Sequence, residues 1–233
     1  MGRNFRFHLY ILFVISMFLT ACDKVAPVPE HKEIPVIPEM TEDLLPVIDG
    51  ILQPGEWDHA VIEYIGEGSE LYLLRSGEYL YLAVRAIPAQ MIAGNVFLHE
   101  GDLITIHHTS AALGTATYQK ENATWRKIED FDWCCRSRIE TDAATEARED
   151  FFNRDGWLGI NSFLGNENEL EYQLRISGSV QSIAVNLIWA DDPNRKQVWP
   201  AGLSDGVATP TAGGFPETMN FSPDTWFILK ELP

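Results

Sequence analysis

Hydrophobic and polar residues alternate along most of the chain, in short runs separated by turn residues. Residues 69–75 and 78–86 are two such runs, and a Ser-Gly pair lies between them. In the second run Leu80, Leu82 and Val84 share one face, as the two-residue period of a β-strand requires. The pattern predicts a β-hairpin.

A second hairpin is predicted from residues 95–99 and 103–109, because a Glu-Gly-Asp turn separates two runs rich in β-branched or aromatic side chains. Four later runs show the same pattern of a short strand between polar turns: 115–119, 170–176, 182–188 and 225–229. Short strands without regularly alternating helices are typical of an antiparallel sandwich or barrel. We therefore expect an all-β, jelly-roll-like antiparallel β-sandwich.

One stretch departs from the strand pattern. Residues 142–152 are rich in Ala and acidic side chains, with Asp142 as the N-cap candidate and Gly156 beyond the end, so we expect a short helix. It lies in the long connection between Lys120 and Leu170. We expect that connection to be irregular, and such connections often carry binding loops.

The chain begins with a basic head, Arg3 and Arg6, followed by an apolar run at residues 9–19 that is too short to span a bilayer. The Leu-Thr-Ala-Cys sequence that ends at Cys22 resembles the bacterial lipobox. This resemblance implies that residues 1–21 are a lipoprotein signal peptide and that Cys22 carries the lipid. The alternative is an ordinary signal peptide with a chance cysteine.

Residues 22–46 contain five prolines among charged residues and show no regular hydrophobic period. They predict a stiff Pro-rich tether, with residues 47–233 as the folded domain. A first strand hidden in the last residues of the tether is the alternative. Together with the lipobox, the tether predicts a protein anchored by lipid in the bacterial cell envelope, its domain in the periplasm or at the cell surface.

The composition of the chain limits the kinds of partner that it can bind. The 233-residue chain is 45% hydrophobic, enough for one sizeable core, and its net charge of −17 disfavours nucleic acid as a partner. Of the three cysteines, only Cys134 and Cys135 remain once Cys22 is lipidated. In an oxidising compartment such an adjacent pair can close a vicinal disulfide. Free thiols or intermolecular pairing are the alternatives.

Residues 47–60 contain an Ile-Asp-Gly turn and a Glu-Trp pair three residues before Ala60. This string resembles the opening of family 9 carbohydrate-binding modules and of the wider group of DOMON-like β-sandwiches. The resemblance continues through an acidic strand, Glu-Leu-Glu-Tyr, that begins at Glu169, and through the closing residues 223–229. It implies a β-sandwich that binds sugar between aromatic rings, and it implies structural calcium.

Sugar recognition needs flat aromatic faces together with groups that hold hydroxyls. The side chains of this kind that we select are Trp133, Trp199, Trp125, Phe215, Arg136 and Arg138. For each ring, burial in the core is the alternative. A phenylalanine at position 215 departs from a two-tryptophan clamp. Trp57 and Trp189 are expected in the core.

Two cofactor hypotheses remain open. Asp191 and Asp192 supply oxygen ligands that suit calcium, although an Asp-Asp-Pro-Asn string is also a common turn. Some DOMON-like sandwiches bind b-type haem, so His107 or His108 with Met91 forms the second hypothesis. Because neighbouring strand positions face opposite sides, at most one of these histidines faces inward. A buried, hydrogen-bonded histidine is the alternative to a haem ligand.

The chain contains no H-E-x-x-H, G-x-S-x-G, P-loop or Rossmann motif. We therefore expect a non-enzymatic lipoprotein that binds a glycan or oligosaccharide in carbohydrate breakdown. One alternative is a redox domain with haem b. The other is a structural or assembly lipoprotein that has lost the sugar site and binds an envelope protein instead.

Overall fold

The computed structural model describes residues 36–66, 68–135, 141–161, 168–192, 194–209 and 214–229. All of them belong to one compact unit, Ile34–Pro233. The predicted signal peptide, Cys22 and the first part of the predicted tether lie outside the described residues. No helix among the described residues has both the length and the apolar content needed to cross a bilayer.

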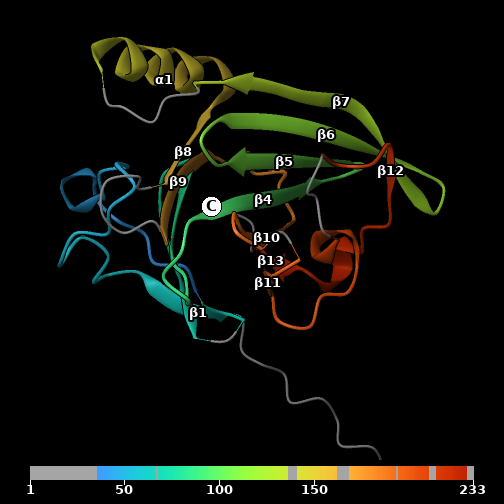
Figure 1. The fold of residues 1–233 in the computed structure, drawn as a ribbon, viewed down its shortest axis with the longest axis horizontal. Helices are drawn as coiled ribbons and strands as arrows, with labels where there is room; N and C mark the ends of the chain where they lie inside the picture. Colours follow the sequence, from blue (N-terminus) through green and yellow to red (C-terminus); the bar gives the residue numbers. More distant parts are fainter. Residues whose placement is uncertain are drawn as a thin grey trace, which may run out of the picture. The chain divides into compact units, whose positions relative to one another are not determined.

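Two antiparallel sheets form the fold (Figure 1). The smaller sheet contains, in spatial order, β1 (Val61–Ile65), β2 (Ser69–Ser76), β3 (Tyr79–Arg85), β9 (Glu169–Arg175) and β8 (Trp157–Asn161). The larger sheet contains β11 (Lys196–Trp199), β10 (Ser182–Trp189), β4 (Ile92–Glu100), β5 (Leu103–Thr109), β6 (Leu113–Glu121), β7 (Thr124–Cys134) and β12 (Thr218–Met219), and β13 (Phe227–Ile228) pairs with β10. The expected all-β antiparallel sandwich is confirmed.

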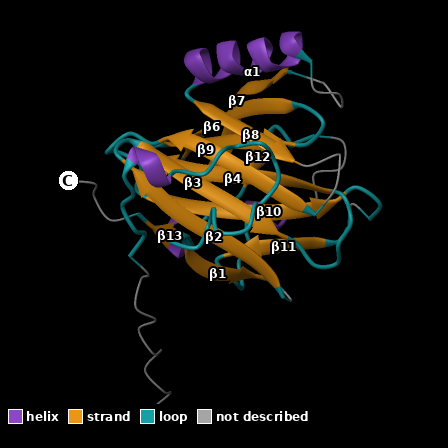
Figure 2. Ribbon diagram, turned by 90° about the vertical axis from the view of Figure 1, so that its left-hand side faces the viewer, coloured by secondary structure: helices purple, strands orange, loops and turns teal. Residues whose placement is uncertain are grey.

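Both predicted hairpins are present, as β2–β3 and β4–β5. Gly77 and Gly101 occupy their turns with φ of 53° and 58°, a region that side chains disfavour. The predicted helix is α1 (Asp142–Asp155), which Figure 2 shows beside β7. Its N-cap is Thr141 rather than Asp142, because the Thr141 side chain accepts a hydrogen bond from the backbone of the first turn. The described 3-10 helices are η1 (Glu42–Leu44), η2 (Gly206–Ala208) and η3 (Pro223–Thr225).

The expectation of an irregular connection between Lys120 and Leu170 is wrong. It contains β7 and β8, and β7 is an eleven-residue strand. Most β7 residues are exposed, and register shifts interrupt the pairing of β7 with β6, so the strand carries no apolar alternation that a sequence pattern can detect. The expected strand at 225–229 shortens to the two residues of β13 because η3 occupies Pro223–Thr225.

The end of the tether belongs to the folded unit. Met40 donates its backbone N–H to the carbonyl of Arg75 at 2.8 Å, and the Arg75 N–H is bonded to the Pro38 carbonyl at 3.0 Å. These bonds form a short parallel bridge along β2. Packing therefore begins before residue 47, and the hidden first strand is reduced to this bridge.

Apolar side chains pack in three layers. The largest core lies between the sheets and includes Leu80, Leu82 and Val84, as the hairpin pattern predicts, together with Trp157 and Trp189. A second core covers the outer face of the large sheet, where C-terminal side chains pack on β4 to β7. A third covers the outer face of the small sheet, beneath residues 48–60. Each sheet is thus covered on both faces, and only restricted areas remain for ligand binding.

Candidate functional site

Three of the aromatic rings selected from the sequence are buried. Trp125, Trp199 and Phe215 are 3%, 2% and 6% exposed. Trp199 packs on Phe227 with ring centroids 4.8 Å apart, and Trp125 donates its indole N–H to a backbone carbonyl in the C-terminal segment. Their place near loops suggested exposure, but Trp125 and Phe215 belong to the core beneath the C-terminal segment, and Trp199 belongs to the core between the sheets. None of the three presents a free face to a sugar.

Trp133 is different. The structure describes all seven tryptophans, and six are at most 4% exposed, whereas Trp133 is 44% exposed. It lies near the end of β7 and stacks on Phe131 with centroids 4.8 Å apart and 24° between the planes. Phe131 in turn packs on Phe215. Phe215 therefore supports the exposed ring from below. Arg136 and Arg138, the selected cations nearby, lie outside the described residues.

Gly114 allows this ring pair to lie against the sheet. A Cβ atom at Gly114 would come within 2.8 Å of Trp133 and 2.9 Å of Phe131. Gly114 pairs with Trp133 across β6 and β7, and with His108 across β5 and β6. With no side chain between them, the rings of His108 and Trp133 approach to 5.3 Å in an edge-to-face arrangement at 89°.

The same row continues through the large sheet as three polar side chains. His108 pairs with Asn95 of β4, and Asn95 pairs with Asn186 of β10. The Asn95 amide lies 2.7 Å from Nδ1 of His108 and donates to Asn186 at 2.6 Å, and Asn186 donates to the Val207 carbonyl at 2.7 Å. Burial lowers the pKa of His108 to about 4, so its imidazole is neutral at pH 7.

The exposure of the side chains increases along this row. Asn95 and Asn186 are at most 1% exposed, His108 is partly buried, and Trp133 reaches solvent. We call the side chains of His108, Phe131 and Trp133 the aromatic rim. It combines an exposed indole with a neutral imidazole, which is the mixture of ring face and hydrogen-bonding group that sugar recognition uses.

Cys134 and Cys135 form the vicinal disulfide, so they are neither free thiols nor partners of another chain. The disulfide directly follows Trp133 at the end of β7. Sγ of Cys135 lies 3.3 Å from the Ala147 carbonyl of α1. The disulfide thus connects the exposed indole to the helix.

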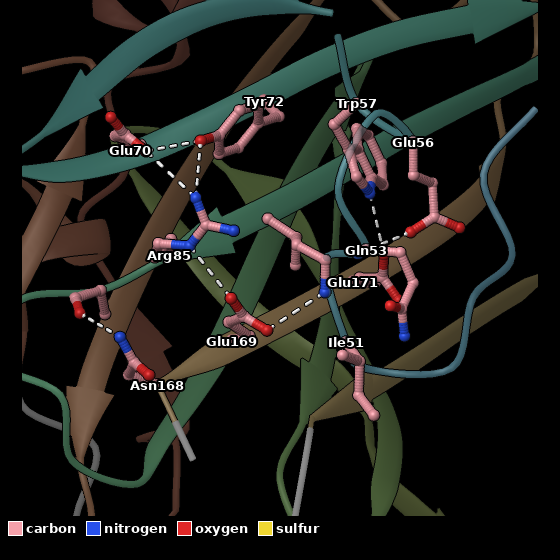
Figure 3. A network of polar contacts seen from close by, with 12 residues as sticks. Ile51, Gln53, Glu56, Trp57, Glu70, Tyr72, Arg85, Asn168, Glu169 and Glu171 are labelled. Carbon is pink, nitrogen blue, oxygen red and sulfur yellow. Dashed lines mark hydrogen bonds and ion pairs between the residues drawn. The ribbon is translucent and has the colours of Figure 1, made fainter. Parts of the chain in front are cut away.

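A polar network covers the outer face of the small sheet (Figure 3). Glu171 is fully buried, and its carboxylate accepts the backbone N–H groups of Asp49 and Gly50 at 3.0 and 2.7 Å and the indole N–H of Trp57 at 2.9 Å. Burial is the main cause that raises the pKa of Glu171 to about 7, and the three donors oppose it. Trp57 is in the core, as the sequence predicts.

The neighbouring carboxylate completes the network. Glu169 accepts from the backbone N–H of Leu52 at 3.1 Å and from Nε of Arg85 at 3.0 Å. On the far side of Arg85, Glu70 lies 3.8 Å from the guanidinium and accepts from the Tyr72 hydroxyl (Figure 3). Two parts of the chain that carry the family resemblance, residues 47–60 and the acidic strand, therefore contact each other. Their role in this fold is structural.

The described residues bring no three His, Cys, Asp or Glu side chains together in a metal-binding group. The Asp192 carboxylate accepts the backbone N–H of Asn194 at 3.1 Å, a local side-chain bond that is common for Asp in turns. Calcium at Asp191 and Asp192 stays a prediction.

The two histidines of the haem hypothesis face opposite sides of β5, as their spacing requires. His107 packs on Trp157 between the sheets, with ring centroids 4.8 Å apart, whereas His108 bonds Asn95 on the outer face. Val96 is the partner of His107, and Met91 lies five residues before it, roughly 16 Å along an extended strand. The described fold thus separates Met91 from His107.

Comparison with family models, with curated proteins and with solved structures finds no match to this chain. The site must therefore be judged on its own geometry. Sequence reasoning selected Trp133, but it considered His108 only as a haem ligand or a buried, hydrogen-bonded histidine, and it missed Phe131, Asn95 and Asn186. A signal for part of the row was available, because a two-residue turn at Gly101 pairs Asn95 with His108.

Proposed function

We propose that this protein is a non-enzymatic, lipid-anchored lipoprotein of the bacterial envelope that binds a neutral glycan or oligosaccharide through the aromatic rim. The observation that carries the proposal is the exposure of Trp133, which is 44% exposed, whereas the other six tryptophans are at most 4% exposed. Tryptophan is highly buried on average, so an indole that stays exposed beside supporting rings is the candidate for contact with a ligand.

The support around Trp133 strengthens the argument. Phe131 and Phe215 hold the indole from one side, Gly114 gives it room, and the disulfide follows it directly. A ring fixed before binding loses little conformational entropy when a sugar stacks on it. His108 then adds a hydrogen-bonding group at the edge of the same ring.

The test is binding of the full chain, purified in mild detergent, to a glycan array, followed by titration of the best ligand. Trp133→Ala should lower the affinity by about 1–3 kcal/mol and shift the thermal midpoint by only a few degrees. Tyr64→Ala is the matched control, because Tyr64 is an aromatic residue of the other sheet and is 65% exposed. It should leave the affinity unchanged.

Three results would contradict the proposal. If the protein binds no glycan and captures a defined envelope protein, the assembly-lipoprotein alternative is correct. A Soret band in the purified protein would favour the haem alternative. An equal loss of affinity in the Trp133 and Tyr64 variants would place the binding surface elsewhere.

A further inference from the structure

We infer that the amide ladder beneath the aromatic rim fixes His108 as the Nδ1–H tautomer, so that Nε2 accepts a hydroxyl hydrogen from the ligand. The amide ladder consists of Asn186, Asn95 and the backbone carbonyl of Val207. The part of the inference that concerns the ligand rests on the proposed function. The tautomer itself does not.

The starting point is the carbonyl of Val207, which can only accept a hydrogen bond. The Asn186 side chain lies 2.7 Å from it, so the amide nitrogen of Asn186 must face the carbonyl. The amide oxygen of Asn186 then faces Asn95. If Asn186 were flipped, two acceptors would meet at that distance.

The same logic passes along the ladder. The oxygen of Asn186 needs a donor, so Asn95 presents its nitrogen there, at 2.6 Å. The oxygen of Asn95 then faces Nδ1 of His108 at 2.7 Å. Because that oxygen only accepts, Nδ1 carries the proton. Both amides are at most 1% exposed, so water does not offer an alternative partner.

A neutral imidazole has one proton, and Nδ1 holds it, so Nε2 has a free lone pair. Burial keeps the ring neutral at pH 7, since it lowers the pKa of His108 to about 4. Within the described part of the chain, no hydrogen-bond partner occupies Nε2, and the ring is partly exposed beside Trp133.

A ligand on the aromatic rim therefore meets an acceptor next to the indole. A sugar hydroxyl satisfies it by donating. A carboxylate or a sulfate has only acceptors to offer, so it would face the lone pair without forming a bond. Uronate and sulfated glycans retain some hydroxyls, but their charged groups cannot bond this lone pair and are repelled by the net charge of −17. Neutral, hydroxyl-rich glycans are therefore favoured.

The first measurement is a long-range ¹H–¹⁵N correlation spectrum of the full chain at pH 7, which reports the tautomer of each histidine. The expected result is a protonated Nδ1 and an unprotonated Nε2 at His108. In Asn95→Ala the fixed preference should disappear, and the amide spectrum shows whether that variant is still folded. A protonated Nε2 in the unmodified protein would overturn the inference, whether or not any glycan binds.

Two substitutions separate the two nitrogens of the ring. His108→Asn keeps a donor toward Asn95 but removes the Nε2 position, and we expect about tenfold weaker glycan binding, the effect of losing one hydrogen bond. His108→Gln places an amide near Nε2 and should bind more tightly than His108→Asn. Equal affinities of His108→Asn and the unmodified protein would show that Nε2 does not contact the ligand.

The ligand class is tested with cellohexaose, xylohexaose and mannohexaose, each against a carboxylated or sulfated oligosaccharide of equal length. Binding restricted to the neutral probes supports the inference, and preference for the charged probes overturns it. If no probe binds while Nδ1 is protonated, the proposed function fails and the tautomer assignment stands. The two failures are therefore distinguishable.

Discussion

The outer faces of the two sheets are covered in similar ways, but the polar networks on these faces end differently. On the small sheet, Glu171 and Glu169 accept backbone N–H groups from the N-terminal segment that lies on them. On the large sheet, Asn186 donates to a backbone carbonyl of the C-terminal segment, which lies on that face. In both cases a buried polar side chain of a strand binds the covering segment through its backbone.

The difference lies where each network reaches solvent. On the small sheet it ends in Arg85, whose guanidinium is bonded to Glu169 and faces Glu70 and Tyr72. On the large sheet it ends in His108, where, among the described residues, only one ring nitrogen has a hydrogen-bond partner. In a closed ion-pair network the donors and acceptors are paired with one another. An amide ladder that ends in a neutral imidazole instead leaves one hydrogen-bond acceptor that a ligand can use. Under our proposal, the small-sheet network has a structural role and the row on the large sheet has a binding role.

The largest effect is expected when the small-sheet network is broken. Glu171→Ala leaves two backbone N–H groups and the Trp57 indole without their acceptor, and we expect a loss of more than about 3 kcal/mol in the free energy of unfolding. Urea denaturation measures it. Glu70→Gln at the exposed end is the control, with a change below about 1 kcal/mol. Comparable losses in both variants would contradict a structural role centred on Glu171.

The equivalent change on the large sheet should be smaller but should also affect the site. Asn186→Ala leaves the Val207 carbonyl and the Asn95 amide unpaired, which costs about 2 kcal/mol of unfolding free energy. It should also release the tautomer of His108 and weaken glycan binding. Glu171→Ala should do neither while the protein remains folded. If glycan affinity falls equally in both variants at low temperature, the two faces are not independent.

Glu171 and the two buried histidines change the stability in opposite directions as the pH varies. Burial raises the pKa of Glu171 to about 7, so the folded protein keeps a proton that the unfolded chain loses above pH 4.5, and this contribution to stability disappears as the pH rises toward 7. Burial lowers the pKa values of His107 and His108 to about 3 and 4. Their unfolded forms take up protons below pH 6.5, so stability falls as the pH decreases from there.

Each group changes the slope by up to about 1.4 kcal/mol per pH unit. The two histidines together contribute more to this slope than the one glutamate. The unfolding free energy should therefore decrease as the pH is lowered from 6.5 to 4.5. Urea denaturation across this range measures the slope. His108→Asn should make the acid decrease shallower, and Glu171→Ala should make it steeper. A reversed order of the two slopes would contradict the assigned shifts.

Reduction of the disulfide should have the smallest effect on stability. Cys134 and Cys135 are adjacent, so the disulfide closes almost no loop and restricts the unfolded chain little. We expect less than about 1 kcal/mol of change in unfolding free energy, because loop closure contributes little here. The fluorescence of Trp133 should change on reduction, since the disulfide directly follows it. The Cys134→Ser/Cys135→Ser double variant should not respond to the reductant, and an unchanged spectrum in the unmodified protein would show that the disulfide does not affect the indole.

The sequence predicts the fold well where apolar residues alternate between two turn residues. The β2–β3 and β4–β5 hairpins are of this kind, since Gly77 and Gly101 mark their turns. β7 could not be predicted because most of its residues are exposed and register shifts interrupt its pairing with β6, and β1, β8 and β11 are too short for a clear period. The pairing of residues near Met40 with β2 was expected only as an alternative, because its hydrogen bonds involve only the backbone.

The site was predicted in part. Trp133 was selected for its place in a polar stretch beside two arginines, and it is the exposed tryptophan. Trp199 and Trp125 were selected by similar reasoning and are buried, because the C-terminal segment and Phe227 cover them. Position relative to a loop does not determine burial when a distant segment returns over the sheet.

The sequence alone determined the strand periods, the turns and the acidic charge. It also offered a disulfide between Cys134 and Cys135 as one alternative. These are local properties, set by a few neighbouring residues. Only the tertiary structure decided which rings are covered, and it brought Asn186, Asn95, His108 and Trp133 into one row from four separate strands. The register of four strand pairs sets that row, and register depends on the packing of both sheets at once.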